Sequence, residues 1–416
     1  MYRTRRRGAL RQTGEGTGRL YSITVSRRVL LSGLSLLTLS ACTGGGFDFG
    51  GFGPSGPPDN GMDLPLAEGQ TFGTGPVRVA LLLPLTGDAA AVGTSMAHGA
   101  ELAMDFIAQN ANINDNITLV LKDTGSSVQA AAAAAQQAVG EGASLILGPL
   151  RADQVSAAGG VARSAGIPLI GFSNNSGAAQ PGIYLLNVLP ESETKRSLGY
   201  AKSIGKRAFA GLFPNSDYGR IQQSAFTQAA ADLGLRVVGV YSFGSEAEAR
   251  TVVQQVAPLL QAGQVDTLFL PDRATAPSFG VLFEEAKVAG GAIQIIGSAD
   301  WNGDQAIMNT PWLAGALYPA VDDAGYQAIL PLYQAKFGAN RPHPFITLAY
   351  TGVVLANVSS LSLGTPRYDR AQLTTPGGFN GRDGVFRFLS DGRSEYALVI
   401  KKVTIGGAQL VDGPKI

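Results

Sequence analysis

Residues Ala143 to Gly177 read ASLILGPLRADQVSAAGGVARSAGIPLIGFSNNSG. Two short apolar runs, Ser144 to Leu147 and Pro168 to Phe172, enclose an alanine-rich segment from Asp153 to Ala165 whose apolar residues recur at helical spacing. The pattern predicts a strand, a helix and a second strand. A helical link of this length joins parallel strands through a right-handed crossover.

Both predicted strands end in small or polar residues. Gly148-Pro149-Leu150-Arg151 follow the first strand, and Ser173-Asn174-Asn175-Ser176 follow the second. Ligands of open α/β sheets bind at the carboxyl ends of the strands. We therefore expect these two loops to form one wall of a binding site.

The same alternation of strands and helices extends on both sides of this stretch. Before and after it the pattern predicts strands at Val77 to Leu83, Ile117 to Leu121 and Ile183 to Val188, and helices at Thr94 to Gln109 and Val128 to Val139. Such an alternation predicts a doubly wound parallel sheet.

A second alternation begins after Pro190. It predicts helices at 192–204, 218–233, 249–261 and 276–289, and strands at 208–213, 236–243, 267–270 and 293–297. Two arrays of this kind in one chain of 416 residues predict two similar lobes.

Four segments resemble a known family in their order and spacing. They are VRVALLLPLTGDAAAVGTSMAHGAELAMDFI from Val77, GPLRADQVSAAGGVARSAGIPLIGFSNNSG from Gly148, FPNSDYGRIQQSAF from Phe213 and GFNGRDGVFRFLSDG from Gly378. Together they resemble the type 1 periplasmic binding proteins of the Leu/Ile/Val-binding branch, from about Val77 to the C-terminus. The resemblance implies an α/β fold of two doubly wound Rossmann-like lobes, joined by a hinge that the chain crosses three times.

The resemblance also implies how the chain is divided between the lobes. Residues 77–190 and 318–376 are expected in lobe one, with 318–375 mostly helical. Residues 191–317 and 377–416 are expected in lobe two, with paired strands at 385–389 and 396–403. Closure of the hinge around a ligand is the expected motion.

The N-terminus has the composition of an export signal. Basic residues crowd the first 28 positions, an apolar run extends from Val29 to Leu39, and Leu39-Ser40-Ala41-Cys42 follows. This end resembles the lipobox of bacterial lipoproteins, which implies a signal peptide over 1–42 and a lipid on Cys42. Cys42 is the only cysteine, so no internal disulfide forms; an incidental thiol is the alternative.

Residues 43–76 are rich in Gly and Pro and predict a flexible tether. We expect a periplasmic protein held at a membrane through the lipid, with the inner and outer membranes both open. Ser26-Arg27-Arg28 is compatible with twin-arginine as well as general export.

Composition and motifs argue against two classes of function. Charged residues make up 15% of the chain and the formal net charge is +1, whereas a nucleic-acid-binding protein needs a basic face. His98 and His343 are the only histidines and are expected to be structural, and no metal cluster, cofactor motif or catalytic triad stands out. We therefore expect a binding protein without cofactor or metal, and not an enzyme.

The family resemblance implies a site for a small zwitterion, held by hydroxyls, backbone amides, a carboxylate and an aromatic wall. The matching positions here are Thr86, Gly87, Leu150, Arg151, Ser173, Asn174, Asn175, Tyr218, Thr275 and Asp300.

Several positions depart from the family pattern. Val92 stands where an aromatic often occurs, Ala152 replaces a carboxylate-binding hydroxyl, Asn175 replaces a threonine and Thr275 a tyrosine. Ala299 takes the place of the ammonium-binding acid, with Asp300 next to it.

The sequence leaves two interpretations open for each of two arginines and one acidic loop. Arg151 either binds an anion through its planar guanidinium or starts a helix at the surface, and Arg273 is a similar candidate. The loop from Asp300 to Asp304 either touches ligand or is a solvated turn.

Two functions follow from the resemblance. The first is a lipid-anchored receptor that binds an amino-acid-like or anionic ligand and serves an ABC permease in amino-acid transport. The second rests on the loops LLLPLTG, ILGPL and IGFSN, which also resemble lipoproteins that activate bifunctional penicillin-binding proteins in peptidoglycan synthesis. A fold alone does not decide between them.

Overall fold

A computed structural model describes residues 69–338 and 341–416, all of which belong to one compact unit, Phe47–Ile416. The predicted signal peptide, Cys42 and most of the predicted tether lie outside the described residues. Within the described ranges, every helix is too short or too polar to cross a membrane.

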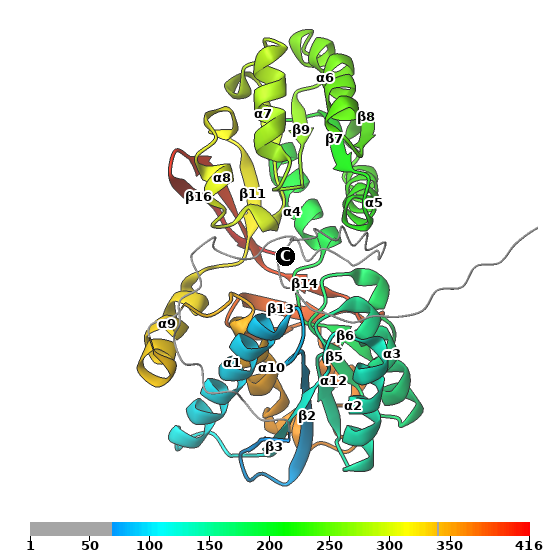
Figure 1. The fold of residues 1–416 in the computed structure, drawn as a ribbon, viewed down its shortest axis with the longest axis vertical. Coiled ribbons are helices and arrows are strands. Elements are labelled where there is room, and N and C mark those ends of the chain that lie inside the picture. The colour runs from blue at the N-terminus through cyan, green and yellow to red at the C-terminus, as the bar shows by residue number, and fades with distance from the viewer. Residues whose placement is uncertain (1–68, 339–340) are drawn as a thin grey trace, which may run out of the picture. The chain divides into compact units, whose positions relative to one another are not determined.

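The first lobe is built on a six-stranded sheet of order β1-β3-β2-β4-β5-β6, parallel except for β1. Its strands are β1 (Thr71–Phe72), β2 (Val77–Leu83), β3 (Ile117–Asp123), β4 (Leu145–Leu147), β5 (Leu169–Gly171) and β6 (Ile183–Leu185). The helices between them are α1 (Ala90–Gln109), α2 (Val128–Gly140), α3 (Ala152–Ser164) and the 3-10 turn η1 (Ser176–Ala178). In Figure 1, α2 and α3 lie together on one side of these strands.

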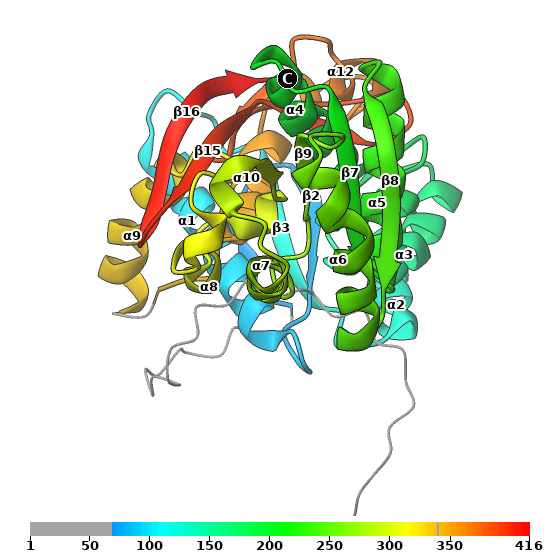
Figure 2. The same ribbon diagram turned by 90° about the horizontal axis from the view of Figure 1, so that it is seen from above.

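The second lobe has a seven-stranded sheet of order β16-β15-β11-β10-β9-β7-β8, in which β7 to β11 are parallel and β15 and β16 antiparallel. Its strands are β7 (Ala208–Pro214), β8 (Arg236–Phe243), β9 (Thr267–Phe269), β10 (Gln294–Ile296), β11 (Leu317–Ala320), β15 (Leu398–Thr404) and β16 (Gly407–Lys415). Its helices are α4 (Pro190–Ser203), α5 (Asp217–Asp232), α6 (Glu246–Gln261), α7 (Ala276–Glu285) and α8 (Gln305–Met308), with 3-10 turns η2 (Gly290–Ala292), η3 (Ala299–Trp301) and η4 (Pro311–Leu313). Figure 2 shows β15 and β16 as two long neighbouring strands, which pair antiparallel.

The chain crosses between the lobes three times, after β6, after β11 and after β14. The segment between the last two crossings returns to the first lobe. It contains α9 (Ala324–Phe337), α10 (Ile346–Ala356), α11 (Ser359–Ser362), α12 (Arg370–Leu373) and a small antiparallel sheet of β12 (Phe379–Gly381), β13 (Gly384–Phe388) and β14 (Ser394–Tyr396). The predicted fold class, two doubly wound lobes with a three-crossing hinge, is confirmed.

The stretch that predicted the fold forms its expected strand, helix and strand. β4 and β5 are parallel, with Ile146 opposite Leu169. All residues of both strands are buried, as a strand covered on both faces requires. The intervening α3 buries Val155 and Ala158 against the sheet, so helical spacing in the sequence located its inner face.

The end of the predicted tether is wrong, because it belongs to the first sheet. Thr71 and Phe72 pair antiparallel with Val120 and Leu119 of β3. Phe72 packs against the core of the first lobe. Two residues are too short for a periodic pattern, and the strand forms because the edge of β3 offers backbone partners.

The predicted lobe boundaries shift at both later crossings. The sequence predicts Tyr318 in lobe one, but β11 pairs with β10 and Tyr318 is buried in the second lobe's core. Strand β13 is predicted in lobe two, but Phe386 belongs to the first lobe's core and stacks on Tyr396 at 5.4 Å. The predicted strand 396–403 is divided, because Tyr396 ends β14 whereas β15 begins at Leu398. Burial of these aromatic rings, which no local pattern shows, sets the boundaries.

Each lobe has a glycine where a helix meets the end of the preceding strand. A Cβ atom on Gly93 of α1 would lie 1.9 Å from the carbonyl oxygen of Pro84, just after β2. A Cβ atom on Gly219 of α5 would lie 1.8 Å from the carbonyl oxygen of Pro214, at the end of β7. These contacts hold each helix start against the loop that leads to the cleft.

We expect Gly219→Ala to lower the midpoint of thermal unfolding, because the methyl group has no space beside Pro214; such overpacking costs about 1–3 kcal/mol. Gly199→Ala is the matched control, since no heavy atom lies within 4 Å of its Cβ position in α4. Alanine should leave that variant unchanged or stabilise it by up to ~1 kcal/mol. Equal midpoints for the two variants, measured by circular dichroism, would contradict the packing argument.

Candidate functional site

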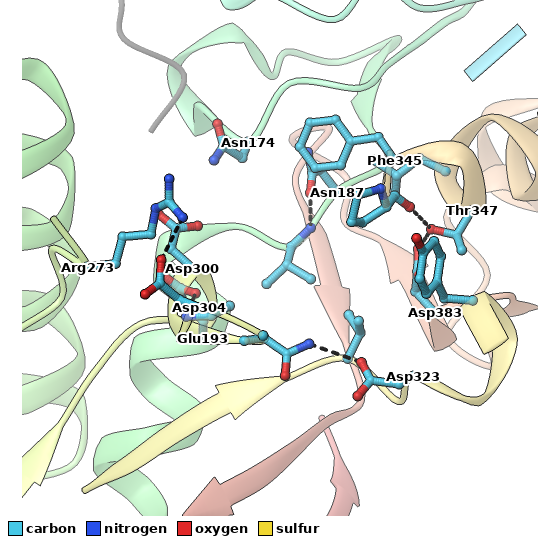
Figure 3. Close-up of a pocket in the computed structure, with 18 of the residues that line it drawn as sticks. Asn174, Asn187, Glu193, Arg273, Asp300, Asp304, Asp323, Phe345, Thr347 and Asp383 are labelled. Atoms are coloured by element: carbon cyan, nitrogen blue, oxygen red, sulfur yellow. Dashed lines mark hydrogen bonds and ion pairs between the residues drawn. The ribbon is translucent and has the colours of Figure 1, made fainter. Parts of the chain in front are cut away.

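A cavity of about 560 Å³ is lined by residues of both lobes and of the crossing segments. Figure 3 shows its polar side chains in two groups, with Arg273, Asp300 and Asp304 on one side and Thr347 and Asp383 on the other. The first group follows parallel strands of the second lobe, where this fold class places its ligands.

The second-lobe wall is made by the segments that follow β7, β9 and β10. Tyr218 lies in the first turn of α5, Arg273 lies between β9 and α7, and Asp300 lies in η3. Tyr218 is positioned by its hydroxyl, which lies 3.2 Å from Ser298 Oγ and 3.3 Å from the carbonyl oxygen of Pro271. Burial raises the pKa of this hydroxyl, which therefore stays protonated.

Glu193, in the first turn of α4, is the most deeply buried acid of the cavity wall, with 5% of its surface exposed. Its Oε1 accepts a hydrogen bond from Gln222 Nε2 at 2.7 Å, and its Oε2 accepts one from the backbone N–H of Ala299 at 2.8 Å. Burial, followed by the charge of Asp300, raises the pKa of Glu193 to about 8.

Asp300 is only partly exposed and carries the second carboxyl group of this wall. Burial raises its pKa to about 6, while a hydrogen bond from Tyr218 and the charge of Arg273 act in the opposite direction. Two neighbouring carboxyl groups in a desolvated wall repel each other when ionised. A cation bound in the cavity beside them would reduce that repulsion.

Arg273 is held by Asp304 through an ion pair of 2.9 Å. Asp304 is itself fixed, because its Oδ1 caps α8 by accepting from the N–H of Ile307 at 3.0 Å. The buried Nε of Arg273 has no acceptor among the described residues. Arg273 lines the cavity and is the basic side chain of this wall.

The opposite wall is largely apolar. It contains Val321, Tyr326, Pro342, Pro344, Phe345 and Leu348. Two acids interrupt it, Asp323 and Asp383. Asp383, 8% exposed, accepts a hydrogen bond from Thr347 Oγ1 at 2.9 Å, and burial raises its pKa to about 7.

A closed polar network lies where the crossing segments meet. Lys401 forms an ion pair with Asp323 and donates to Asn302 Oδ1 at 3.0 Å. Asn302 Nδ2 donates in turn to Asp323 Oδ1 at 3.0 Å. The network joins β15, the end of η3 and the segment before α9, and so ties two crossings to the second-lobe wall.

Three of the predicted site residues line the cavity, namely Asn174, Tyr218 and Asp300. The other predicted residues lie in the loops but not on the cavity surface; they are Thr86, Gly87, Leu150, Arg151, Ser173, Asn175 and Thr275.

Four of those seven residues shape the loops in which they lie. Thr86 Oγ1 donates to Asp123 Oδ2 at 2.6 Å, and Thr275 Oγ1 donates to Asp272 Oδ2 at 2.5 Å. Arg151 lies 3.5 Å from Asp88. Gly87 has a φ of 87°, in the left-handed region.

The remaining three predicted residues are used in packing and capping. Leu150 is buried in the first lobe's core. Ser173 Oγ accepts from the N–H of Asn175, and the Asn175 side chain caps η1.

Sequence reasoning missed Glu193 and Asp383. Nothing local marks Glu193, because it sits among polar residues at a helix start. Asp383 lies in the GFNGRDG turn, which was noted for its family likeness and not for its carboxyl group. The loop from Asp300 to Asp304 does face the cavity, as one of its two interpretations required.

Metal binding has little support in residues 69–338 and 341–416, where no group of three or more His, Cys, Asp or Glu side chains is placed to hold an ion. His98 instead stacks on Phe337 at 3.9 Å between ring centres, and His343 meets the edge of Phe345 at 4.7 Å.

Solved structures share this fold at low sequence identity. A putative branched-chain amino acid ABC transporter from Rhodospirillum rubrum is 18% identical, covers 80% of this chain and 99% of its own, and has a TM-score of 0.67. LivJ of Streptococcus pneumoniae, in complex with isoleucine, is 20% identical over 81% of this chain and 99% of its own, with a TM-score of 0.56. A Rhodopseudomonas palustris solute-binding protein, in complex with 3,4-dihydroxybenzoic acid, is 18% identical over 82% and 98%, with a TM-score of 0.56.

No curated protein matches the chain in sequence. The sequence profile of the periplasmic binding proteins matches residues 76–358, which is more than half of the chain. Proteins of this kind bind solutes and are not enzymes, as the sequence analysis expected. The chain therefore belongs to the periplasmic binding protein family.

Proposed function

We propose that this protein is the lipid-anchored substrate-binding component of an ABC transporter, and that it holds an amino-acid-like ligand in the cleft between its lobes. The observation that carries the proposal is the pair of second-lobe acids, Glu193 and Asp300, beside Tyr218 and opposite an apolar wall. An ammonium group next to an apolar body fits that arrangement.

The charged residues of the cavity favour an amino-acid-like ligand over a purely anionic one. Acidic side chains outnumber basic ones in the lining: Glu193, Asp300, Asp304, Asp323 and Asp383 against Arg273 and Arg341. A purely anionic ligand, such as the dihydroxybenzoate of the Rhodopseudomonas protein, would bring no cation to Asp300 and Glu193. A zwitterion, such as the isoleucine of LivJ, brings a cation to the acids.

The proposed roles follow from the contacts. Asp300 accepts the ligand's ammonium group, with Tyr218 packing beside it. Arg273 and Asn174 take the carboxylate. The other predicted residues hold the loops in place. Thr86 binds Asp123, Gly87 makes the turn after it, and Arg151 lies beside Asp88. Leu150 lies in the core, Ser173 and Asn175 precede η1, and Thr275 lies at the start of α7.

Location and partner are inferred from the N-terminus and the family. A lipid on Cys42 would keep the body near a membrane and raise its effective concentration at a permease. An activator of a penicillin-binding protein, the alternative from the sequence, would work through protein contact and would leave the cleft without a preferred amino acid.

A ligand screen tests the cleft. We expect at least one L-amino acid at millimolar concentration to raise the thermal midpoint, because a ligand that binds only the folded state stabilises it. Asp300→Asn should weaken that ligand at least about tenfold through loss of a charge-assisted hydrogen bond. Asp232→Asn, at the exposed end of α5, is the control and should bind as the wild type does.

No shift with any amino acid would defeat this function. Crosslinking of the intact chain to a bifunctional penicillin-binding protein, together with such a result, would support the alternative.

The buried acids predict how stability depends on pH. Because folding raises the pKa of Glu193 and Asp383 from 4.5 and 3.8 to about 8 and about 7, the folded state holds these protons more tightly. The free energy of unfolding of the ligand-free protein should therefore be highest near pH 4 and fall as pH rises to about 8. Asp383→Asn should make this decline shallower. Urea unfolding at several pH values measures it, and parallel curves for variant and wild type would refute the assignment.

The anchor has a separate test. We expect Cys42→Ser to move the protein from the membrane fraction to the periplasmic extract, because the serine cannot carry the lipid of a lipoprotein. Gly51→Ala, in the predicted tether, should stay with the membrane. Unchanged partition of the serine variant would show that another element holds the protein there.

A further inference from the structure

Asp383 is a carboxyl group of the cavity that the proposed amino-acid head group leaves unused. It lies across the cavity from Asp300 and Arg273 (Figure 3). Only Oδ2 is engaged, by Thr347. Among residues 69–338 and 341–416, no donor reaches Oδ1 and no cation pairs with this carboxylate.

The basic side chains of the neighbouring elements are committed elsewhere. Lys401 pairs with Asp323. Arg382 stacks on the ring of Tyr350 at 4.2 Å and donates to its hydroxyl at 2.7 Å. Arg341 lies over the ring of Tyr326. The protein thus buries Asp383 in the cavity wall and brings no counter-charge to it.

A second observation also points to a ligand rich in N–H groups. Gln222 lines the cavity with 1% of its surface exposed. Its Nε2 donates to Glu193, whereas its buried Oε1 has no donor among the described residues. A buried acceptor without a donor is costly, and a bound donor would remove that cost.

We propose that the ligand is an amino acid with a cationic side chain, whose α-ammonium lies at Asp300, whose carboxylate lies at Arg273 and whose side-chain cation lies at Asp383. This assignment rests on the proposed function, because it places the head group in the site described there. The apolar wall of Val321, Tyr326, Phe345 and Leu348 covers the methylene groups between the two ends.

The arrangement discriminates against leucine-type side chains. An aliphatic end placed against Asp383 would leave the carboxylate buried without a partner, whereas an ammonium or guanidinium group would pair with it. Sites built to bind a polar group reject analogues that lack it far more strongly than apolar pockets reject a missing methylene.

Calorimetry with three related ligands tests the inference on the full-length protein in detergent. L-Lysine and L-norleucine share the α-carbon groups and a four-carbon chain, and differ in the terminal ammonium. Cadaverine retains the two ammonium groups and lacks the carboxylate. We expect lysine, ornithine or arginine to bind at least about tenfold more tightly than norleucine, and cadaverine to bind more weakly than lysine.

Two variants complete the test. Asp383→Asn should remove the preference for lysine while norleucine still binds, and that retained binding also shows that the variant is folded. Asp322→Asn removes the same charge at an exposed position, next to Asp323 in the sequence, and should keep the preference for lysine. Norleucine binding as tightly as all three basic amino acids, or an unchanged preference in Asp383→Asn, would overturn the inference alone. Failure of every amino acid to bind would overturn the proposed function with it.

Discussion

The carboxyl group of Glu193 connects three parts of the chain that build the second-lobe wall. It sits in the first turn after the first crossing, and its two oxygens accept from Gln222 of α5 and from the backbone of Ala299. The second bond fixes the turn that carries Asp300, and Gln222 also reaches the hydroxyl of Tyr218. Loss of this carboxyl group would release both side chains that face the ligand space.

The buried acids of the cavity wall destabilise the folded protein when no ligand is bound. Glu193, Asp300 and Asp383 all lose solvation in the cavity wall, and each pKa rises as a result. A structure shaped only for stability would place apolar groups or ion pairs at these positions. The raised pKa values of these acids in a cavity wall therefore support the proposed binding site.

The strand-end loops after β2 and β3 place no polar side chain in the cavity, because their polar groups hydrogen-bond to one another. Asp123 accepts from the backbone of Leu85, from Thr86 Oγ1 and from the N–H of Gly125, so its oxygens are occupied. The loop after β2 therefore acts as a rigid support. The charged residues that line the cavity therefore come from the second lobe and from the segments around Asp323, Arg341 and Asp383.

The sequence by itself determined the local elements and the family. Strands at 77–83 and 236–243 were predicted with the bounds that the structure has, because hydrophobic period and turn residues are local properties. Of the site positions that the family resemblance implied, Asn174, Tyr218 and Asp300 line the cavity.

Only the tertiary structure decided which lobe receives Tyr318 and Phe386, and which acids lose their solvent. Asp383 and Glu193 are 190 positions apart in the chain, and each is buried by segments distant from it in sequence. The residues next to an acid in the sequence do not show whether it is buried. Its pKa rises when the fold removes water from it. Desolvation is therefore a property of the packed molecule, and the local pattern of residues does not contain it.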